Sequence, residues 1–121
     1  MASKVLLECS FYIPIHRDPE LSDGAAHPPA ALSWLRDTLS DHRFDVVIFA
    51  RSLYEGMWTS PKSGQLLTHR SQRYIVALPP ARLNELREML AEACAVFRQQ
   101  MIYLSIAGHV EFIEASPHDA R

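Results

Sequence analysis

The feature that most constrains the fold of this 121-residue chain is a strict alternation of side chains near its N-terminus. Every odd position from Val5 to Ile15 is apolar, whereas the even positions are mostly polar. A period of two sustained over this length predicts a β-strand that is covered on one face only. The even-numbered residues Glu8, Tyr12 and His16 are therefore expected on the uncovered face.

A second alternation, from Met101 to Glu114, predicts the last strand, with Gly108 marking a bulge. One side of this strand is expected to be apolar and to face the core: Ile102, Leu104, Ile106, Val110 and Phe112. The other side carries Tyr103, Ser105, His109 and Glu111. If the two terminal strands are neighbours, Tyr103, His109 and Glu111 share one polar sheet face with Tyr12.

Two helices and a hairpin are predicted between these strands. Pro28 and Pro29 suit the first turn of a helix that continues to about His42, and apolar residues at helical spacing predict a second helix over residues 81–100. The β-branched and aromatic segment 45–54 predicts a strand. The turn-forming run SPKSG then predicts a hairpin into a strand that ends at Leu78, before two prolines.

The resulting order, βαββαβ, predicts an α+β fold of the ferredoxin-like kind. Its four-stranded antiparallel sheet would carry two helices on one face, with the first and third strands in the centre. We expect a single domain over residues 1–115 and a polar C-terminal tail over residues 116–121. The opposite face of the sheet is left bare, so it is the place where a function is expected.

Composition excludes several classes of function. The formal charge of −2 comes from 12 basic and 14 acidic residues mixed along the chain, which argues against nucleic-acid binding. No apolar stretch is long enough to cross a bilayer and none resembles a signal peptide, so no membrane association and a cytoplasmic location are expected. Cys9 and Cys94 are predicted to be buried free thiols. His16 and Asp18 match no metal-binding spacing, and no cofactor motif is present, so neither a metal nor a cofactor is predicted.

The hairpin holds a second group of candidate residues. Trp58 follows one strand, while His69, Arg70 and Arg73 precede or enter the next. Arginine beside tryptophan suits a planar or anionic ligand through bidentate hydrogen bonds and stacking. An exposed hairpin kept soluble by charge explains the same residues and is the favoured interpretation.

Short motifs in the second half of the chain resemble a group of small, mostly uncharacterised bacterial proteins. The motifs are Gly-x-Trp at Gly56 and Trp58, the segment Arg70 to Tyr74, and Phe-x-Gln at Phe97 to Gln99. The resemblance implies a bacterial ferredoxin-like domain and brings no activity or catalytic residues with it.

Three hypotheses for the function follow. The first is a small-ligand-binding or protein-interaction module that forms a homodimer through its sheet and takes a small polar or anionic ligand. The alternative is a cofactor-independent enzyme of the isomerase or monooxygenase type, with His109 or His16 as the base and Tyr12 or Tyr103 as a hydrogen-bond donor. The third is a structural subunit of a larger complex. The candidate binding residues are Glu8, Tyr12, His16, Trp58, Arg73, Tyr103, His109 and Glu111.

Overall fold

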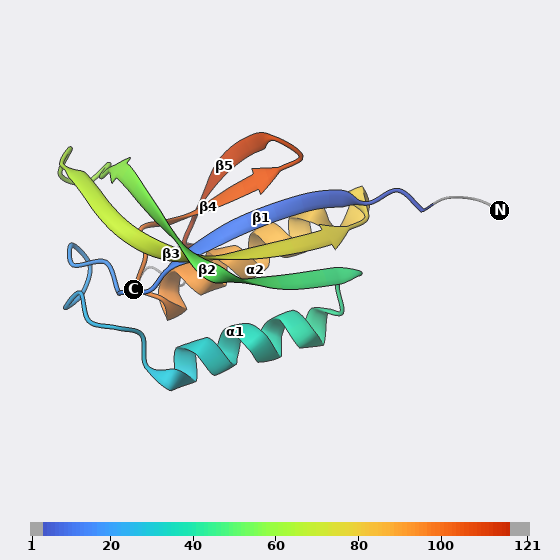
Figure 1. Cartoon of the computed structure of the whole chain (residues 1–121), viewed down its shortest axis with the longest axis horizontal. Helices are drawn as coiled ribbons and strands as arrows, with labels where there is room; N and C mark the ends of the chain where they lie inside the picture. Colours follow the sequence, from blue (N-terminus) through green and yellow to red (C-terminus); the bar gives the residue numbers. More distant parts are fainter. Residues whose placement is uncertain (1–3, 117–121) are drawn as a thin grey trace.

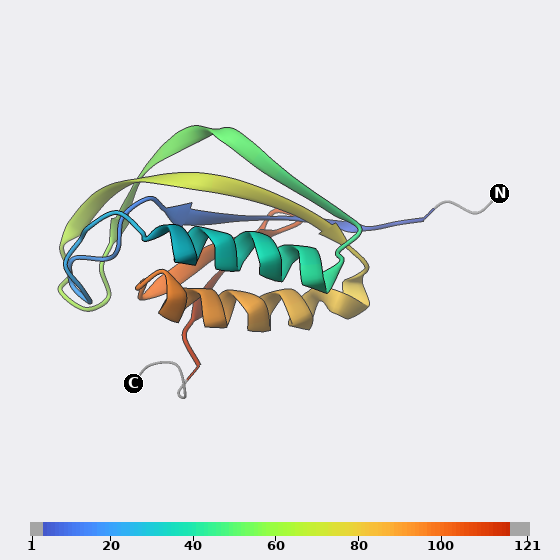
Figure 2. The same cartoon turned by 90° about the horizontal axis from the view of Figure 1, so that it is seen from below.

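The structure is a computed structural model that describes residues 4–116, and it has two layers. One layer is a five-stranded antiparallel sheet and the other is a pair of α-helices that lie side by side on one sheet face (Figures 1 and 2). The elements in chain order are β1 (Leu7–Pro14), α1 (Pro29–His42), β2 (Val46–Thr59), β3 (Leu66–Leu78), the short 3-10 helix η1 (Pro80–Arg82), α2 (Leu83–Val96), β4 (Met101–Ile106) and β5 (His109–Glu114). The predicted α+β class with two helices on one sheet face is confirmed. The predicted tail falls mainly on residues 117–121, which lie outside the described residues.

The strand order in the sheet is β2-β3-β1-β4-β5. The predicted central position of β1 and β3 is confirmed, because β1 pairs with β3 on one side and with β4 on the other. The predicted number of strands is wrong. The segment 101–114, predicted as one last strand, is a hairpin of β4 and β5. The chain reverses at Ala107 and Gly108, where φ is 47° and 93°. Gly108 therefore marks a two-residue turn between strands instead of a bulge.

The hairpin reverses which residues of the last segment face the helices. Tyr103 pairs with Phe112 and Ser105 pairs with Val110, so these four residues lie on the bare face of the sheet. Val110 and Phe112 are consequently 48% and 52% exposed, although the sequence pattern predicted them in the core. The other half of the prediction holds, since Ile102, Leu104 and Ile106 are buried.

The core lies between the sheet and both helices. From β1 it receives Cys9, Phe11 and Ile13, which are at most 2% exposed, as the period of two predicts. The stripe of α2 contributes Leu86, Leu90, Ala93 and Cys94, and Phe97 closes it at the end of the helix. In α1 the buried residues are Ala31, Leu35 and Leu39, whereas Leu32 is 49% exposed and does not join the core. Both cysteines are buried, as predicted.

The long hairpin of β2 and β3 extends beyond the end of β1 and bends toward the loop that follows β1 (Figures 1 and 2). Its turn is the predicted SPKSG segment. The amide of Gly64 donates to the Ser60 carbonyl oxygen at 2.8 Å, and Gly64 has a φ of +73°, which glycine adopts without strain. This geometry confirms the predicted hairpin and places its end over one end of the sheet. No helix of the described residues is long and apolar enough to cross a membrane.

Candidate functional site

Two adjoining cavities lie where the β2–β3 hairpin meets the loop after β1. The first, which we call the aromatic cavity, has a volume of about 380 Å³ and is lined by residues of all five strands, among them Tyr12, Tyr54, Tyr103 and Phe112. The second, the polar cavity, has a volume of about 590 Å³ and is lined by the loop residues Ile15 to Pro19 and by residues 67–70 of β3. Both volumes fall in the range of small-molecule sites. Pro14, Glu55, Trp58, His69 and Gln99 line both cavities, and we call these five the junction residues.

The aromatic cavity is built by strand pairing. Tyr12, Tyr103 and Phe112 lie on the bare face of β1, β4 and β5, and neighbouring rings meet edge to face at centroid distances of 5.3 and 5.8 Å. Tyr54 of β2 meets Tyr12 from the other side at 5.6 Å. This geometry is the preferred one for aromatic pairs, and it leaves ring surface open to a planar or cationic ligand.

Arg73 supports this row of rings from the same sheet face. Its Nε and Nη2 donate to Ser10 Oγ at 3.2 and 2.9 Å, and its guanidinium carbon lies 6.0 Å from the Tyr54 ring centroid. The hydrogen bond with Tyr54 raises the pKa of Arg73, so the side chain stays cationic. Arg73 does not line either cavity.

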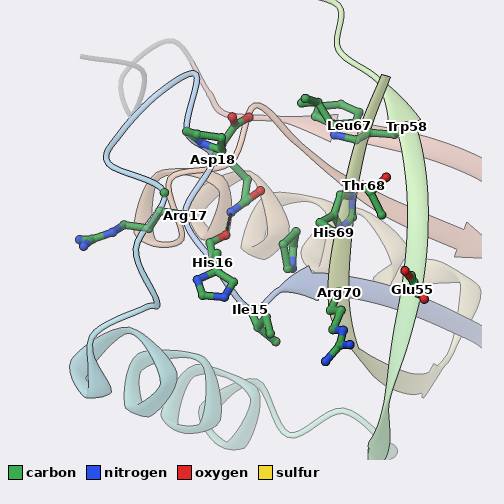
Figure 3. Close-up of a pocket in the computed structure, with 14 residues that line it drawn as sticks. Ile15, His16, Arg17, Asp18, Glu55, Trp58, Leu67, Thr68, His69 and Arg70 are labelled. Carbon is green, nitrogen blue, oxygen red and sulfur yellow. Dashed lines mark hydrogen bonds between the residues drawn. The ribbon is translucent and has the colours of Figure 1, made fainter. Parts of the chain in front are cut away.

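The polar cavity lies between the loop after β1 and the hairpin strands, as Figure 3 shows. His16 and Asp18 come from the loop, whereas Thr68, His69 and Arg70 come from β3. The Arg17 side chain points away from the hairpin and donates from Nη2 to Asp23 Oδ2 at 2.9 Å. Arg70 pairs in register with Glu55 of β2, and neither side chain takes part in an ion pair within residues 4–116.

The loop is held in place by a buried carboxylate. Asp18 is 5% exposed; its Oδ1 accepts from the Glu20 amide at 2.8 Å and its Oδ2 accepts from Gln100 Nε2 at 2.9 Å. The same Nε2 of Gln100 donates to Glu20 Oε1, which also accepts from the Ser60 hydroxyl at the hairpin turn. We call Asp18, Glu20, Ser60 and Gln100 the clasp, because they join the loop, the hairpin turn and the segment after α2.

The protonation of His69 and the orientation of the Gln99 amide, both at the junction, follow from their surroundings. Burial lowers the pKa of His69, whose Nδ1 lies 3.0 Å from Ser71 Oγ and whose ring meets Trp58 edge to face at 6.4 Å. His69 is therefore neutral at neutral pH and able to accept a proton. Gln99 is 7% exposed, and its Nε2 donates to the carbonyl oxygens of Phe97 and His16 at 2.9 and 3.0 Å. The dashed line at His16 in Figure 3 marks the second of these bonds.

The structure brings together only some of the residues predicted from sequence. Tyr12 and Tyr103 line the aromatic cavity, His16 lines the polar cavity and Trp58 lines both. Glu8 and Arg73 share the bare face with Tyr12 but lie outside the cavities. Their role as binding residues stays a prediction.

His109 and Glu111 do not share the bare face, so this part of the predicted arrangement is wrong. The β4–β5 turn sends both residues to the helix side, where Glu111 accepts from Arg87 Nε and Nη2 of α2 at 2.9 and 2.7 Å. His109, a candidate base from the sequence, is exposed beside the turn and lines neither cavity. Sequence reasoning missed Tyr54, Glu55, Gln99 and Phe112. The signal that would have placed Phe112 correctly is Gly108 in the middle of an alternating run, because the tight turn of a hairpin needs positive φ, which glycine favours.

No group of three or more metal-ligating side chains is found among residues 4–116. Neither a known protein-family model nor a curated protein sequence matches this chain. Two solved structures share the fold. One is a phage SAM lyase in complex with S-methyl-5′-thioadenosine, with a TM-score of 0.68 and 16% identity over 95% of this chain and 94% of that one. The other is a phage SAM lyase in the apo state, with a TM-score of 0.60 and 13% identity over 96% and 97% of the two chains.

These matches correct two expectations from the sequence. The resemblance to small bacterial ferredoxin-like proteins is wrong, because the fold is matched over nearly the whole chain by the phage proteins. The first functional hypothesis, a small-ligand-binding or protein-interaction module, is wrong, because the fold matches that of phage SAM lyase, which supports the enzyme alternative better. At this level of identity the likeness concerns the fold, and the chain is shown to have the fold of phage SAM lyase.

Proposed function

We propose that this protein binds S-adenosylmethionine and cleaves its sulfonium–carbon bond, releasing S-methyl-5′-thioadenosine. The observation that carries the proposal is the pair of adjoining cavities, one aromatic and one polar, that share five lining residues in a fold shared with phage SAM lyase. Such a site suits a ligand with an adenine ring at one end, a sulfonium in the middle and an amino acid at the other end.

Each part of this ligand has a matching surface. Adenine stacks on aromatic rings, which the aromatic cavity supplies from Tyr12, Tyr54 and Tyr103. The sulfonium is a cation, and both the ring faces and the Glu55 carboxylate at the junction attract it. The amino-acid carboxylate is attracted to Arg70, whose planar guanidinium forms bidentate hydrogen bonds with carboxylates. The predicted small polar ligand is retained in this proposal.

To cleave the sulfonium–carbon bond, the protein has to position the substrate and, in one of two routes, to accept a proton. The sulfur leaves with the electron pair of the broken bond and becomes a neutral thioether. The carbon fragment then completes its valence in one of two ways, by losing a proton from the adjacent carbon or by bonding its own carboxylate oxygen. For the first route two junction groups can accept the proton, Glu55 and the neutral His69. Cys9 and Cys94 lie in the core and take no part.

The test is to incubate the purified full-length chain with S-adenosylmethionine and to measure S-methyl-5′-thioadenosine by chromatography and mass spectrometry. We expect release above the rate in buffer, and a loss of roughly 10²- to 10⁴-fold in the Glu55→Gln variant. Glu114→Gln is the matched control, because Glu114 is exposed on β5 and lines neither cavity. Absence of both product and binding would overturn the proposal, while binding without cleavage would overturn the lyase activity alone. The homodimer stays a prediction from the sequence.

A further inference from the structure

The amide of Gln99 has a fixed orientation. Both hydrogens of its Nε2 are used, since this nitrogen donates to the Phe97 carbonyl oxygen at 2.9 Å and to the His16 carbonyl oxygen at 3.0 Å. Its backbone N–H donates to the Cys94 carbonyl oxygen at 2.9 Å. Rotating the amide by half a turn would place Oε1 against two carbonyl oxygens and lose both hydrogen bonds. Gln99 Oε1 therefore points away from the carbonyl oxygens of Phe97 and His16.

This oxygen is an acceptor without a partner in the protein. No described residue donates a hydrogen bond to Gln99 Oε1, although the side chain is more than nine-tenths buried. The fully enclosed side-chain atoms that lack a partner among residues 4–116 are Arg17 Nε and His27 Nδ1, and Gln99 Oε1 is not one of them. It is therefore reached from open space, and the open space that Gln99 borders is the junction of the two cavities. A largely buried acceptor without a donor is costly unless a ligand supplies one.

We propose that Gln99 is a specificity-determining residue whose Oε1 accepts a hydrogen bond from a ribose hydroxyl of the adenosyl ligand. This inference rests on the proposed function. In an adenosyl sulfonium the ribose lies between the adenine and the sulfur, so a ligand with adenine in the aromatic cavity brings its ribose to the junction. The junction offers two oxygen acceptors of different charge. The cationic sulfur is attracted more strongly to the Glu55 carboxylate, which leaves the neutral amide oxygen of Gln99 for a neutral hydroxyl.

The experiment compares two probes, S-methyl-5′-thioadenosine and its 2′,3′-dideoxy analogue, by isothermal titration calorimetry. The wild type should bind the first about 10- to 100-fold more tightly, because the analogue leaves a buried acceptor unpaired. In Gln99→Met this ratio should fall to within about threefold of one, since the acceptor is gone. The matched control is Gln72→Met. Gln72 is a partly buried amide of β3 whose Nε2 also donates to a backbone carbonyl oxygen, that of Ala50, and it lines neither cavity, so its variant should keep the wild-type ratio.

The outcomes separate this inference from the proposed function. If the wild type binds neither probe, the proposed function fails. If it binds both probes equally, or if Gln99→Met keeps the wild-type ratio, adenosyl binding stands and the role of Gln99 is overturned. Because Gln99 also anchors the loop, Gln99→Met is at risk of unfolding, and the wild type supplies a second measurement. The ¹³C resonance of the Gln99 side-chain carbonyl should shift with S-methyl-5′-thioadenosine and much less with the analogue, and equal shifts would refute the hydrogen bond.

Discussion

Replacing Asp18 with alanine tests whether the clasp holds the loop that walls the polar cavity. The substitution removes two hydrogen bonds to a carboxylate that is 5% exposed, one from the Glu20 amide and one from Gln100 Nε2. Hydrogen bonds to a charged group are worth about 1.5–3 kcal/mol each. Gln100 Nε2 keeps its second acceptor, Glu20 Oε1, so the lower part of the range applies to that bond. We expect Asp18→Ala to lower the free energy of unfolding by about 2–4 kcal/mol.

Asp23→Ala is the matched control, because Asp23 lies in the same loop and accepts the same number of hydrogen bonds. Its partners are the Ala25 amide at 3.0 Å and Arg17 Nη2 at 2.9 Å, but its side chain is 61% exposed, so water replaces the lost bonds. Urea unfolding followed by circular dichroism at neutral pH should show a clear loss for Asp18→Ala and a change several-fold smaller for Asp23→Ala. Equal losses would refute the reasoning that burial gives the clasp its strength.

Further predictions concern pH, the site and the last turn. Burial lowers the pKa of His27 below 6.5, so the unfolded chain binds the proton more tightly than the folded chain. The stability of the wild type should therefore fall as the pH drops below about 6.5. Its urea midpoints at about pH 7.5 and about pH 5.5 should differ more than those of His27→Gln. Glu85 has a pKa lowered to about 2 by Arg82, so its contribution is lost in a separate window, from about pH 4.5 down to 2. Trp58→Ala should weaken S-methyl-5′-thioadenosine binding about 10- to 100-fold in calorimetry, with little change in melting temperature, because the ring lines both cavities and not the core. Gly108→Ala should destabilise by about 1–3 kcal/mol and Ala107→Asn should stabilise by about 0.5–1 kcal/mol in thermal melts, since both positions have positive φ.

Burial patterns that repeat within one element were predictable from sequence, and changes of chain direction were harder to predict. The alternation in β1 identified Cys9, Phe11 and Ile13 as core residues because a strand has a fixed period. The same rule failed after Ile106, because a two-residue turn keeps the alternation intact while it exchanges the faces. As a result Phe112 and Val110 were assigned to the core, and His109 and Glu111 to the bare face.

The two cavities are formed by contacts between segments that lie far apart in the sequence, and no local sequence pattern predicts such contacts. Tyr12 and Tyr103 were found because each lies on the polar side of an alternating strand. Gln99 was noted as part of the Phe-x-Gln motif, and the structure shows its amide bonded to the carbonyl oxygens of Phe97 and His16. Its position between two cavities follows from the bend of the hairpin over the sheet end. That bend is a tertiary feature: the pairing of β2 with β3 is irregular between Phe49 and Leu53, and the clasp joins the hairpin turn to the loop.

The clasp couples the stability of the folded chain to the binding of a ligand in the two cavities. The loop after β1 and the hairpin line the polar cavity, and both are joined to the segment after α2 by Asp18, Glu20, Ser60 and Gln100. A chain in which these segments separate has no polar cavity, so a ligand that needs both cavities binds the folded form alone. At 100 times its dissociation constant such a ligand stabilises the folded state by about 2.7 kcal/mol, which is close to the loss expected for Asp18→Ala. Saturating S-methyl-5′-thioadenosine should therefore raise the urea midpoint of Asp18→Ala toward that of the unliganded wild type. A ligand that binds the variant without raising the midpoint would have to bind the unfolded chain equally well, which would refute a site built from both cavities.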